Sequence, residues 1–389
     1  MYLHDLGIIC ALGSGKAEVL STWFSGRPSQ AEPPVWLKSS VPALGVIGDL
    51  PPVPPALQRY ACRNNRLLMA ALSQMDSAVQ AAMRRFGRSR IGAVLGTSTS
   101  GIAEGEAAVR QFHSDGRLPA GYDYKQQELG GAVEFLTRYL DIRGPAYTVS
   151  TTCSSSANAL AAARRLLSLD LCDAVIVGGG DALCHTTLQG FSALGALSGT
   201  RCNPFSKNRD GTVIGEGAAL FLMSREPAPI ALLGVGVSAD AYHISAPRPD
   251  GSGACAAMRA ALADAGLLPA QVDYINLHGT ATLQNDAMES RAVAQLFGSA
   301  TPCGSSKPAS GHCLGAAGAI EAGLCWLLLS GLNGEQRLPA HLWDGEADPD
   351  LSPLGFVGLD MPKPKRLQYC QSNSFSFGGN NVSLLIGRR

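Results

Sequence analysis

Short apolar runs alternate with longer Ala- and Leu-rich stretches along this chain. Residues 90–98 (RIGAVLGTS), 146–152 (AYTVSTT) and 173–181 (DAVIVGGGD) predict strands, and residues 155–168 (SSANALAAARRLLS) predict a helix. A strand that is covered by helices on both faces shows a nearly continuous apolar run. The alternation therefore predicts an α/β fold.

The pattern of the first half returns in the second. Residues 255–266 (CAAMRAALADAG) predict a helix leading into a strand within 272–282 (VDYINLHGTAT), just as an earlier helix leads into 90–98. In each half a short strand, a polar turn and a long helix follow, within 148–167 and within 302–329. Such self-similarity predicts an internal duplication.

Two prolines in residues 225–230 (REPAPI) interrupt the strand-like pattern at the middle of the chain. They place the division between an N-terminal half, 1–226, and a C-terminal half, 227–389. No flexible linker is visible there, so we expect the halves to pack tightly. A pseudo-two-fold axis between them would bring corresponding ends to one central site.

Composition excludes several classes of protein. The chain has 389 residues, is 46% hydrophobic, and carries 31 basic and 31 acidic residues, so it can bury a large core and shows no bias toward nucleic acid. The apolar start lacks a preceding basic segment, and no apolar run reaches the roughly 18 residues of a membrane span. We expect a cytoplasmic protein with no membrane span. The 11 cysteines form no CxxC pair, so we expect no metal site.

Cys153 lies between a predicted strand and a predicted helix, which places its thiol at a helix N-terminus. There the helix dipole and free N–H groups favour a thiolate. The alternative is a buried core cysteine, but Ser154, Ser155 and Ser156 follow it and would make a poor apolar core. The context favours a nucleophile.

Two of the seven histidines stand beside glycine at corresponding places in the two halves. These are His278 in INLHGTAT and His312 in KPASGHCLGAAGA. Each alone is more typical of a structural histidine, but the duplication would bring both close to Cys153. Lys307 and Glu321 flank His312 in the sequence. They predict either a buried ion pair or a solvated surface pair.

The C-terminal segment SNSFSFGGNNVSLLIG places two phenylalanines before a Gly-Gly turn and a last strand. Glycine there lets backbone N–H groups point at a developing oxyanion, with Phe377 as a movable cover. The alternative is an ordinary turn with core aromatics, and the residues alone leave both open.

The motifs of the chain resemble those of the elongating β-ketoacyl-acyl-carrier-protein synthases, within the thiolase-like superfamily. The resemblance covers essentially the whole chain, and the number, order and spacing of the motifs make it specific. The matching segments are TVSTTCSSSANAL, NRDGTVIGEGAAL, DAYHISAP, NLHGTAT followed by Asp286, KPASGHCLGAAGAIEA and NSFSFGGNN.

The resemblance implies a duplicated five-layer α/β/α/β/α fold, a dimer, and an acyltransferase that condenses an acyl unit with a malonyl unit as carbon dioxide leaves. It implies that Cys153 carries the acyl chain, and that His278 and His312 hydrogen-bond the malonyl thioester oxygen. Lys307 and Glu321 would support this arrangement. No metal or organic cofactor is implied, because phosphopantetheine arrives on the acyl carrier protein.

The resemblance also assigns the surroundings of the nucleophile. The N–H groups of Cys153 and Phe377 would form the oxyanion hole, and Thr280 and Thr282 would hold the pantetheine arm. The gate would comprise Phe375, Ser376 and Phe377.

Two departures from the fatty-acid enzymes are visible. The gate reads FSFGG where those enzymes usually show FGFGG, so Ser376 is expected to alter loop mobility, and Thr212 stands where many relatives carry Phe. With RNNRLLMAAL and GTSTSG, these details resemble the ketosynthases of bacterial aryl polyene clusters. Such enzymes work with an inactive chain-length factor, so a homodimer and a heterodimer are both open.

A basic patch for the acidic carrier protein is predicted, since electrostatic attraction speeds transient docking. Scattered solvated arginines are the alternative. The candidate residues are Arg59, Arg63, Arg66, Lys207 and Arg209.

The rival functions are a catalytically silent chain-length factor, and a thioester hydrolase or simple acyltransferase. Chain-length factors typically lack the active cysteine, whereas this chain retains Cys153, both histidines and Lys307. We therefore expect a β-ketoacyl synthase in fatty-acid-like or aryl polyene chain elongation.

Overall fold

The computed structural model describes residues 1–29, 31–37, 39–46, 48–359, 361, 364 and 366–389. In the first half the strand order is β5-β4-β6-β8-β1, and in the second half it is β11-β10-β13-β14-β9. The first three strands of each set are parallel, and each of the last two is antiparallel to its neighbour. The repeated order and directions confirm the predicted duplication.

The strands of the first set are β1 (Tyr2–Cys10), β4 (Ile91–Gly96), β5 (Ala146–Val149), β6 (Ala174–Asp181) and β8 (Gly217–Ser224). Those of the second set are β9 (Ile230–Ala239), β10 (Tyr274–Asn276), β11 (Pro302–Gly304), β13 (Tyr369–Phe375) and β14 (Asn380–Arg388). The short strands are β2 (Gly13–Ser14), β3 (Ala43–Leu44), β7 (Ile214–Gly215) and β12 (Gly355–Phe356).

The two sets meet through β1 and β9, which pair only at Tyr2 and Ala231. This narrow junction joins two sheets that are otherwise separated by helices. The predicted division between residues 226 and 227 falls in the connection from β8 to β9, and it stays a prediction.

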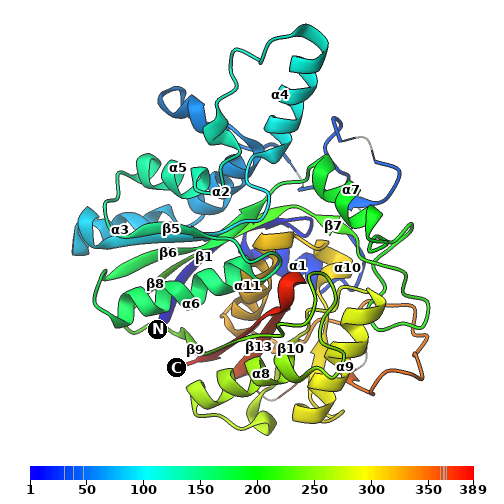
Figure 1. Ribbon diagram of the computed structural model, residues 1–389. Helices are drawn as coiled ribbons and strands as arrows, with labels where there is room; N and C mark the ends of the chain where they lie inside the picture. The colour runs from blue at the N-terminus through cyan, green and yellow to red at the C-terminus, as the bar shows by residue number, and fades with distance from the viewer. Residues whose placement is uncertain (30, 38, 47, 360, 362–363, 365) are drawn as a thin grey trace.

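The helices form three layers around the two sheets, as Figure 1 shows. One sheet carries α2 (Arg63–Ser73), α3 (Asp76–Phe86) and α5 (Gly131–Leu140) on its outer face. The other carries α8 (Ser252–Ala265) and α9 (Leu283–Phe297). Between the sheets lie α6 (Ser155–Ser168) and α11 (Ala317–Leu329). The result is the thiolase-like five-layer fold that the sequence predicted.

The middle layer is the shared core of the two halves. Apart from Glu321, helix α11 is apolar on all sides, and every residue of it except Trp326 is buried. A helix that is apolar all round belongs in the interior. It packs against α6, and the same buried cluster contains Leu160 of α6 and Leu324 of α11. The halves are thus packed tightly, as expected.

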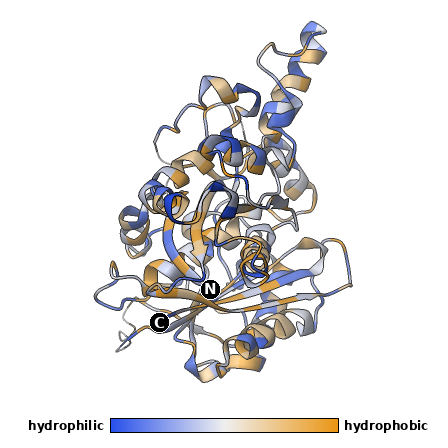
Figure 2. Cartoon of the chain, turned by 90° about the vertical axis from the view of Figure 1, so that its left-hand side faces the viewer, coloured by the Kyte–Doolittle hydropathy of each residue, from blue (hydrophilic) through white to orange (hydrophobic). Residues whose placement is uncertain are grey.

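The remaining helices are α1 (Lys16–Trp23), α4 (Ile102–Asp115), α7 (His185–Ala193) and α10 (Lys307–Ser310). Helix α4 projects from the body of the molecule, as Figure 2 shows. Its side chains Val109 and Phe112 are 55% and 50% exposed. Strand β5 stands at the open end of its sheet, with Tyr147 exposed. Among the described residues, no helix is both long enough and apolar enough to cross a membrane.

Candidate active site

Cys153 lies in the turn between β5 and α6, two residues before the helix begins. The preceding residue, Thr152, has a φ of 53°, a conformation that is uncommon for residues other than glycine and often marks functional turns. The start of α6 packs closely on β4, because a Cβ added at Gly96 would lie 2.2 Å from the backbone nitrogen of Ser156. The small residues after Cys153 therefore let the helix start directly behind the thiol, which is 5% exposed.

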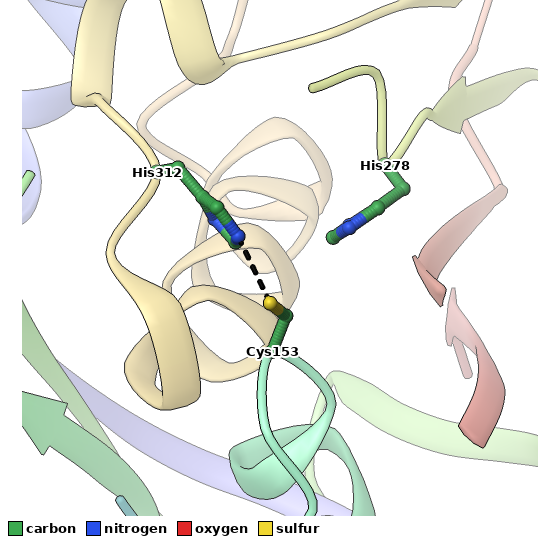
Figure 3. Close-up of side chains that lie close together, drawn as sticks. All are labelled: Cys153, His278 and His312. Atoms are coloured by element: carbon green, nitrogen blue, oxygen red, sulfur yellow. Dashed lines mark hydrogen bonds between the residues drawn. The ribbon is translucent and has the colours of Figure 1, made fainter. Parts of the chain in front are cut away.

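Both predicted histidines face this thiol, as Figure 3 shows. Nε2 of His312 lies 3.0 Å from Sγ of Cys153. The rings of His278 and His312 are nearly perpendicular, with centroids 5.5 Å apart. The backbone of His312 is fixed by hydrogen bonds to Val213 and Gly215, next to and within β7. The duplication thus brings the three residues together.

Glu289 of α9 holds the backbone at His278. Its carboxylate accepts the backbone N–H groups of His278 and Gly279, at 2.7 Å each. Glu289 is buried, and burial raises the pKa of its carboxyl to about 7, although these two backbone hydrogen bonds lower it. The residue therefore fixes the loop that carries His278.

Lys307 lies behind the histidines with its ammonium group fully buried. Its Nζ is 2.5 Å from Oε1 of Glu321, and it also donates to the backbone carbonyl of His278. The third neighbour of the Lys307 Nζ is Nδ1 of His278, at 3.4 Å. An ammonium group has only donors, so Nδ1 must accept, and the ring proton of His278 then stands on Nε2. The Lys307–Glu321 pair is thus the buried alternative of the two that the sequence left open.

The environment keeps both imidazoles neutral. Burial lowers the pKa of His278 well below its ordinary value, and the charge of Lys307 adds to this effect. The same two causes lower the pKa of His312. Neutral rings can donate a hydrogen bond without delivering a proton to a carbanion.

The thiol differs from the sequence-based expectation of a stabilised thiolate. Burial raises the pKa of Cys153 to about 12, and the opposing effects of Lys307 and of the Phe377 N–H are smaller. The resting residue is therefore a thiol. With His312 Nε2 at 3.0 Å, the thiol has a neighbour that can take its proton when a substrate arrives.

The predicted gate segment lies across the nucleophile between β13 and β14. The backbone N–H of Phe377 points to Cys153. Its ring stacks on Phe191 of α7, with centroids 5.5 Å apart, and the ring of Phe375 meets His278 edge-on at 6.3 Å. The side chain of Ser376 is buried against the turn before α6. The segment is therefore in contact with the nucleophile and with His278.

A cavity of about 360 Å³ opens onto these groups. Thr280 and Thr282 line it, with their hydroxyl oxygens 2.9 Å apart, whereas Lys307 and Glu321 stay behind its wall. The lining also includes Cys153, His278, His312, Phe375, Ser376 and Phe377. One cavity thus unites the predicted nucleophile, histidines, threonines and gate.

Two buried carboxylates were not singled out from the sequence. Besides Glu289, Asp181 at the end of β6 accepts the backbone N–H groups of Ser98, Thr99 and Gly315. It therefore ties the loop after β4 to the loop after His312. For Asp181 the available signal was an acid at the end of an apolar strand, whereas Glu289 lies in a helix of mixed polarity that gives no such signal.

The predicted basic patch stays a prediction, and three of its residues are engaged within the chain. Arg63 pairs with the fully buried Glu216, and Arg209, only 7% exposed, pairs with Asp348. Arg66 donates to the backbone carbonyls of Leu50 and Pro51. These contacts hold the three guanidinium groups against the body of the chain, although Arg63 and Arg66 also line a surface pocket. The other two, Arg59 and Lys207, are exposed but lie beside Asp123 and Glu346.

Cys153, His278 and His312 are also the only described side chains that cluster as a possible metal site, with their donor atoms within 4.8 Å of one another. Thiol and imidazole are donors that zinc accepts. The cation Lys307 lies directly behind His278, however, and opposes the binding of a second cation. The arrangement suits acyl chemistry better.

Comparisons with known proteins agree with this geometry. Residues 57–228 match the family described as beta-ketoacyl synthase, N-terminal domain, and residues 230–332 match its C-terminal domain. The chain is 32% identical to nodulation protein E of Rhizobium meliloti, over 98% of this chain and 97% of that protein. It is 35% identical to 3-oxoacyl-[acyl-carrier-protein] synthase 2 of Staphylococcus aureus, over 76% of this chain and 75% of that one.

A solved structure gives the same result at the level of the fold. The complex of the ketosynthase ApeO with its chain length factor ApeC, from Xenorhabdus doucetiae, contains a chain 45% identical to this one. The TM-score is 0.93, and the match covers 100% of this chain and 98% of that chain. With two family matches and full-length relatives, the chain belongs to the β-ketoacyl synthase family.

Proposed function

We propose that this chain joins an acyl group carried on Cys153 to the two-carbon unit left when malonyl-carrier protein loses carbon dioxide. The observation that carries the proposal is the arrangement of one thiol and two neutral imidazoles around one cavity, with Nε2 of His312 3.0 Å from Sγ. No free cofactor is required, because phosphopantetheine comes with the carrier protein.

In the first half-reaction Sγ of Cys153 attacks the thioester of an acyl-carrier protein. The N–H groups of Cys153 and Phe377 stabilise the oxygen of the tetrahedral intermediate. The intermediate collapses as the bond to the pantetheine sulfur breaks, and the proton of the thiol ends on that sulfur. His312 is placed to move this proton. The enzyme then holds an acyl thioester.

In the second half-reaction the carbon–carbon bond of the malonyl carboxylate breaks, and carbon dioxide leaves. The electron pair stays as an enolate of the remaining thioester. Nε2–H of His278 donates to its oxygen, and so does Nε2–H of His312 once the ring proton of His312 has moved from Nδ1 to Nε2 by exchange with water; these bonds stabilise the charge that develops there. The carbanion attacks the acyl carbonyl, and Cys153 leaves as a thiolate that takes a proton from solvent.

Lys307 acts in this scheme without touching the reacting atoms. Its charge adds to burial in keeping the two imidazoles neutral, and its contact with Nδ1 fixes the tautomer of His278. Glu321 compensates the charge of Lys307, so the pair can be buried. Thr280 and Thr282 line the wall of the cavity and suit the polar pantetheine arm.

Acyl groups are elongated while they are attached to a carrier protein. We propose that this enzyme also needs a second polypeptide of the same fold. The support is the exposed edge of β5 and the exposed apolar face of α4. The relative from Xenorhabdus doucetiae was solved with a chain length factor. A heterodimer with such a chain, in aryl polyene synthesis, is favoured over a homodimer.

The catalytically silent alternative lacks a supporting observation. A chain-length factor needs no thiol beside two neutral histidines, whereas this chain has that arrangement in full. A thioester hydrolase would need only Cys153 and an oxyanion hole. The second histidine and Lys307 favour the decarboxylating reaction over hydrolysis.

The test is the formation of β-ketoacyl product from acyl- and malonyl-carrier protein, followed by mass spectrometry. The native chain, with its partner if one is needed, should form the product, and Cys153→Ala should form none. Cys255→Ala, which alters a buried cysteine on the outer helix α8, is the matched control and should behave like the native chain. Product formation by Cys153→Ala at the native rate would refute the proposal.

A second measurement addresses the acyl chain. The mass of the intact protein, which rises when Cys153 is acylated, is compared after exposure to saturated, polyunsaturated and aryl-acyl carrier proteins. The aryl polyene assignment predicts loading of the conjugated chains. Loading of saturated chains alone would exclude it and leave the condensation chemistry in place.

A further inference from the structure

The side chain of Ser376 in the gate makes hydrogen bonds to the turn that carries Cys153. This residue follows β13 and is 8% exposed. Its Oγ lies 3.1 Å from the backbone oxygen of Thr151 and 3.0 Å from Oγ of Ser154, both in the turn that carries Cys153. It also lies 2.9 Å from the backbone oxygen of Asn380, within its own loop.

A serine hydroxyl has only one proton to donate, yet two carbonyl oxygens lie within reach of this one. Donation to Thr151 joins the gate to the nucleophile turn, whereas donation to Asn380 joins Ser376 only to the start of β14. Rotation of one side-chain bond switches between the two. Opening breaks both contacts with the nucleophile turn and keeps only the bond to Asn380, so it leaves no buried hydroxyl unpaired and costs about one net hydrogen bond.

The gate has two further attachments. Oγ1 of Thr152 donates to the carbonyl of Phe377 at 2.8 Å, and the N–H of Gly378 donates to the carbonyl of Ile244 at 2.8 Å. Gly378 and Gly379 have φ values of 82° and 75°, so the turn needs glycine at both positions. These contacts are to the backbone of the gate and are available to any residue at position 376. The hydrogen bonds made by the hydroxyl of Ser376, in contrast, need a hydroxyl at this position.

We propose that Ser376 is a positioning residue whose hydroxyl latches the gate onto the nucleophile turn, with the N–H of Phe377 held at Cys153. The proposal rests on the proposed function and names a device that regulates access to that same site. The latch favours the geometry of the oxyanion hole and slows the entry of bulky groups. Its loss therefore speeds access and weakens catalysis.

The test replaces Ser376 with Ala. Ser376 has φ −114° and ψ 158°, an extended conformation that alanine adopts without strain. Thr151 keeps the hydrogen bond from the hydroxyl of Ser154, and Asn380 keeps the N–H of residue 376. No buried acceptor is orphaned, so the variant should fold. Ser376→Thr retains the hydroxyl and should restore native behaviour.

Access is measured first, without carrier protein, as the rate of Cys153 alkylation by iodoacetamide and by a bulky maleimide. The loss of one net hydrogen bond predicts about a 5-fold faster reaction of Ser376→Ala with the maleimide and little change with iodoacetamide. Ser98→Ala is the control, because its hydroxyl bonds to Thr152 but not to the gate, and it should react like the native chain. Equal rates for Ser376→Ala and the native chain would overturn the latch.

Turnover is measured second. The latch predicts that kcat of Ser376→Ala falls by about 5-fold while KM for a bulky acyl-carrier protein stays level or falls. A merely structural role would instead lower the rate and raise KM together, and that result would overturn the proposal. Since alkylation needs no carrier protein, an absence of condensation by the native chain would refute the proposed function alone.

Discussion

At the scale of single residues, the charge of Lys307 organises the site. It is buried with Glu321 and touches only one of the two histidines, yet after burial itself it is the next cause that lowers the pKa of both. The sequence motifs were enough to name Cys153, His278, His312 and Lys307 as candidates. They could not give the protonation states, which depend on how deeply the fold buries each group.

The first prediction concerns pH. Catalysis needs neutral imidazoles, which are lost as the pH falls through the pKa of each folded histidine. Burial, followed by Lys307, holds the pKa of His278 well below 6.5. The decarboxylation of malonyl-carrier protein should therefore stay level as the pH falls through 6.5, and decline only in more acidic buffer.

The matched variant combines Lys307→Met with Glu321→Gln, because removing both charges leaves none buried without a partner. Without Lys307 the pKa of both histidines rises, so the acidic decline should move to higher pH. Thermal unfolding would confirm that the variant is folded. An acidic decline centred at 6.5 in the native chain would contradict this account of the histidines.

The second prediction concerns Glu289. Glutamine at this position has one oxygen to accept N–H groups, where the carboxylate has two, so one of the bonds to His278 and Gly279 is lost. The decarboxylation rate should fall about 10-fold, as expected for one hydrogen bond to a charged group. Acylation of Cys153, followed by mass spectrometry, should continue at the native rate. A loss of acylation by the same factor would show that Glu289 supports the whole site.

At the scale of elements, the bounds of a helix or strand were predicted correctly where the segment has the same composition along its whole length. Residues 155–168 were predicted as a helix from their Ala and Leu content, and α6 spans Ser155–Ser168. The strand predicted within 272–282 is shorter, because β10 ends at Asn276. Beyond it, the N–H groups of His278 and Gly279 bond to Glu289 instead of to another strand. A side-chain partner on a later helix is not visible in the strand's own sequence.

The third prediction concerns the contact between α6 and α11. A Cβ at Gly318 would lie 2.7 Å from Cβ of Ala157 and 2.8 Å from its backbone nitrogen, so the helices must shift apart. Gly318→Ala should lower the free energy of unfolding by about 1–3 kcal/mol and slow the acylation of Cys153, because α6 begins behind the thiol.

Gly323 of the same helix is the matched control. A Cβ there would lie 3.2 Å from the flexible ends of Ile8 and Leu6, and alanine favours helices by up to about 1 kcal/mol over glycine. Gly323→Ala should therefore be near neutral or stabilising in chemical denaturation. Equal destabilisation by the two substitutions would contradict the close approach of the helices.

At the scale of the whole molecule, the duplication explains why residues far apart in sequence form one site. It was predicted from the repeated pattern, and so was the convergence of Cys153 with both histidines. The partners of the two patch arginines Arg63 and Arg209 were not predictable, because these residues pair with acids that lie 153 and 139 residues away. Such pairings follow from the tertiary fold and leave no local signal.

The fourth prediction concerns the second chain. Val109 and Phe112 expose apolar surface on the projecting helix α4, which suits an interface with another chain. Val109→Asp with Phe112→Asp should convert the dimer to monomers in light scattering coupled to size exclusion. Leu268→Asp, at an exposed apolar residue outside α4, should leave the dimer intact. A dimer that survives the double substitution would place the interface elsewhere.

The central claim is that Cys153, His278 and His312 couple decarboxylation to carbon–carbon bond formation. The most direct measurement uses acyl-Cys153 enzyme in a single turnover with malonyl-carrier protein labelled with ¹³C in the free carboxyl group. We predict one labelled carbon dioxide and one β-ketoacyl-carrier protein for each acyl-Cys153 consumed. Release of the acyl group as free acid, without β-ketoacyl product, would contradict the account.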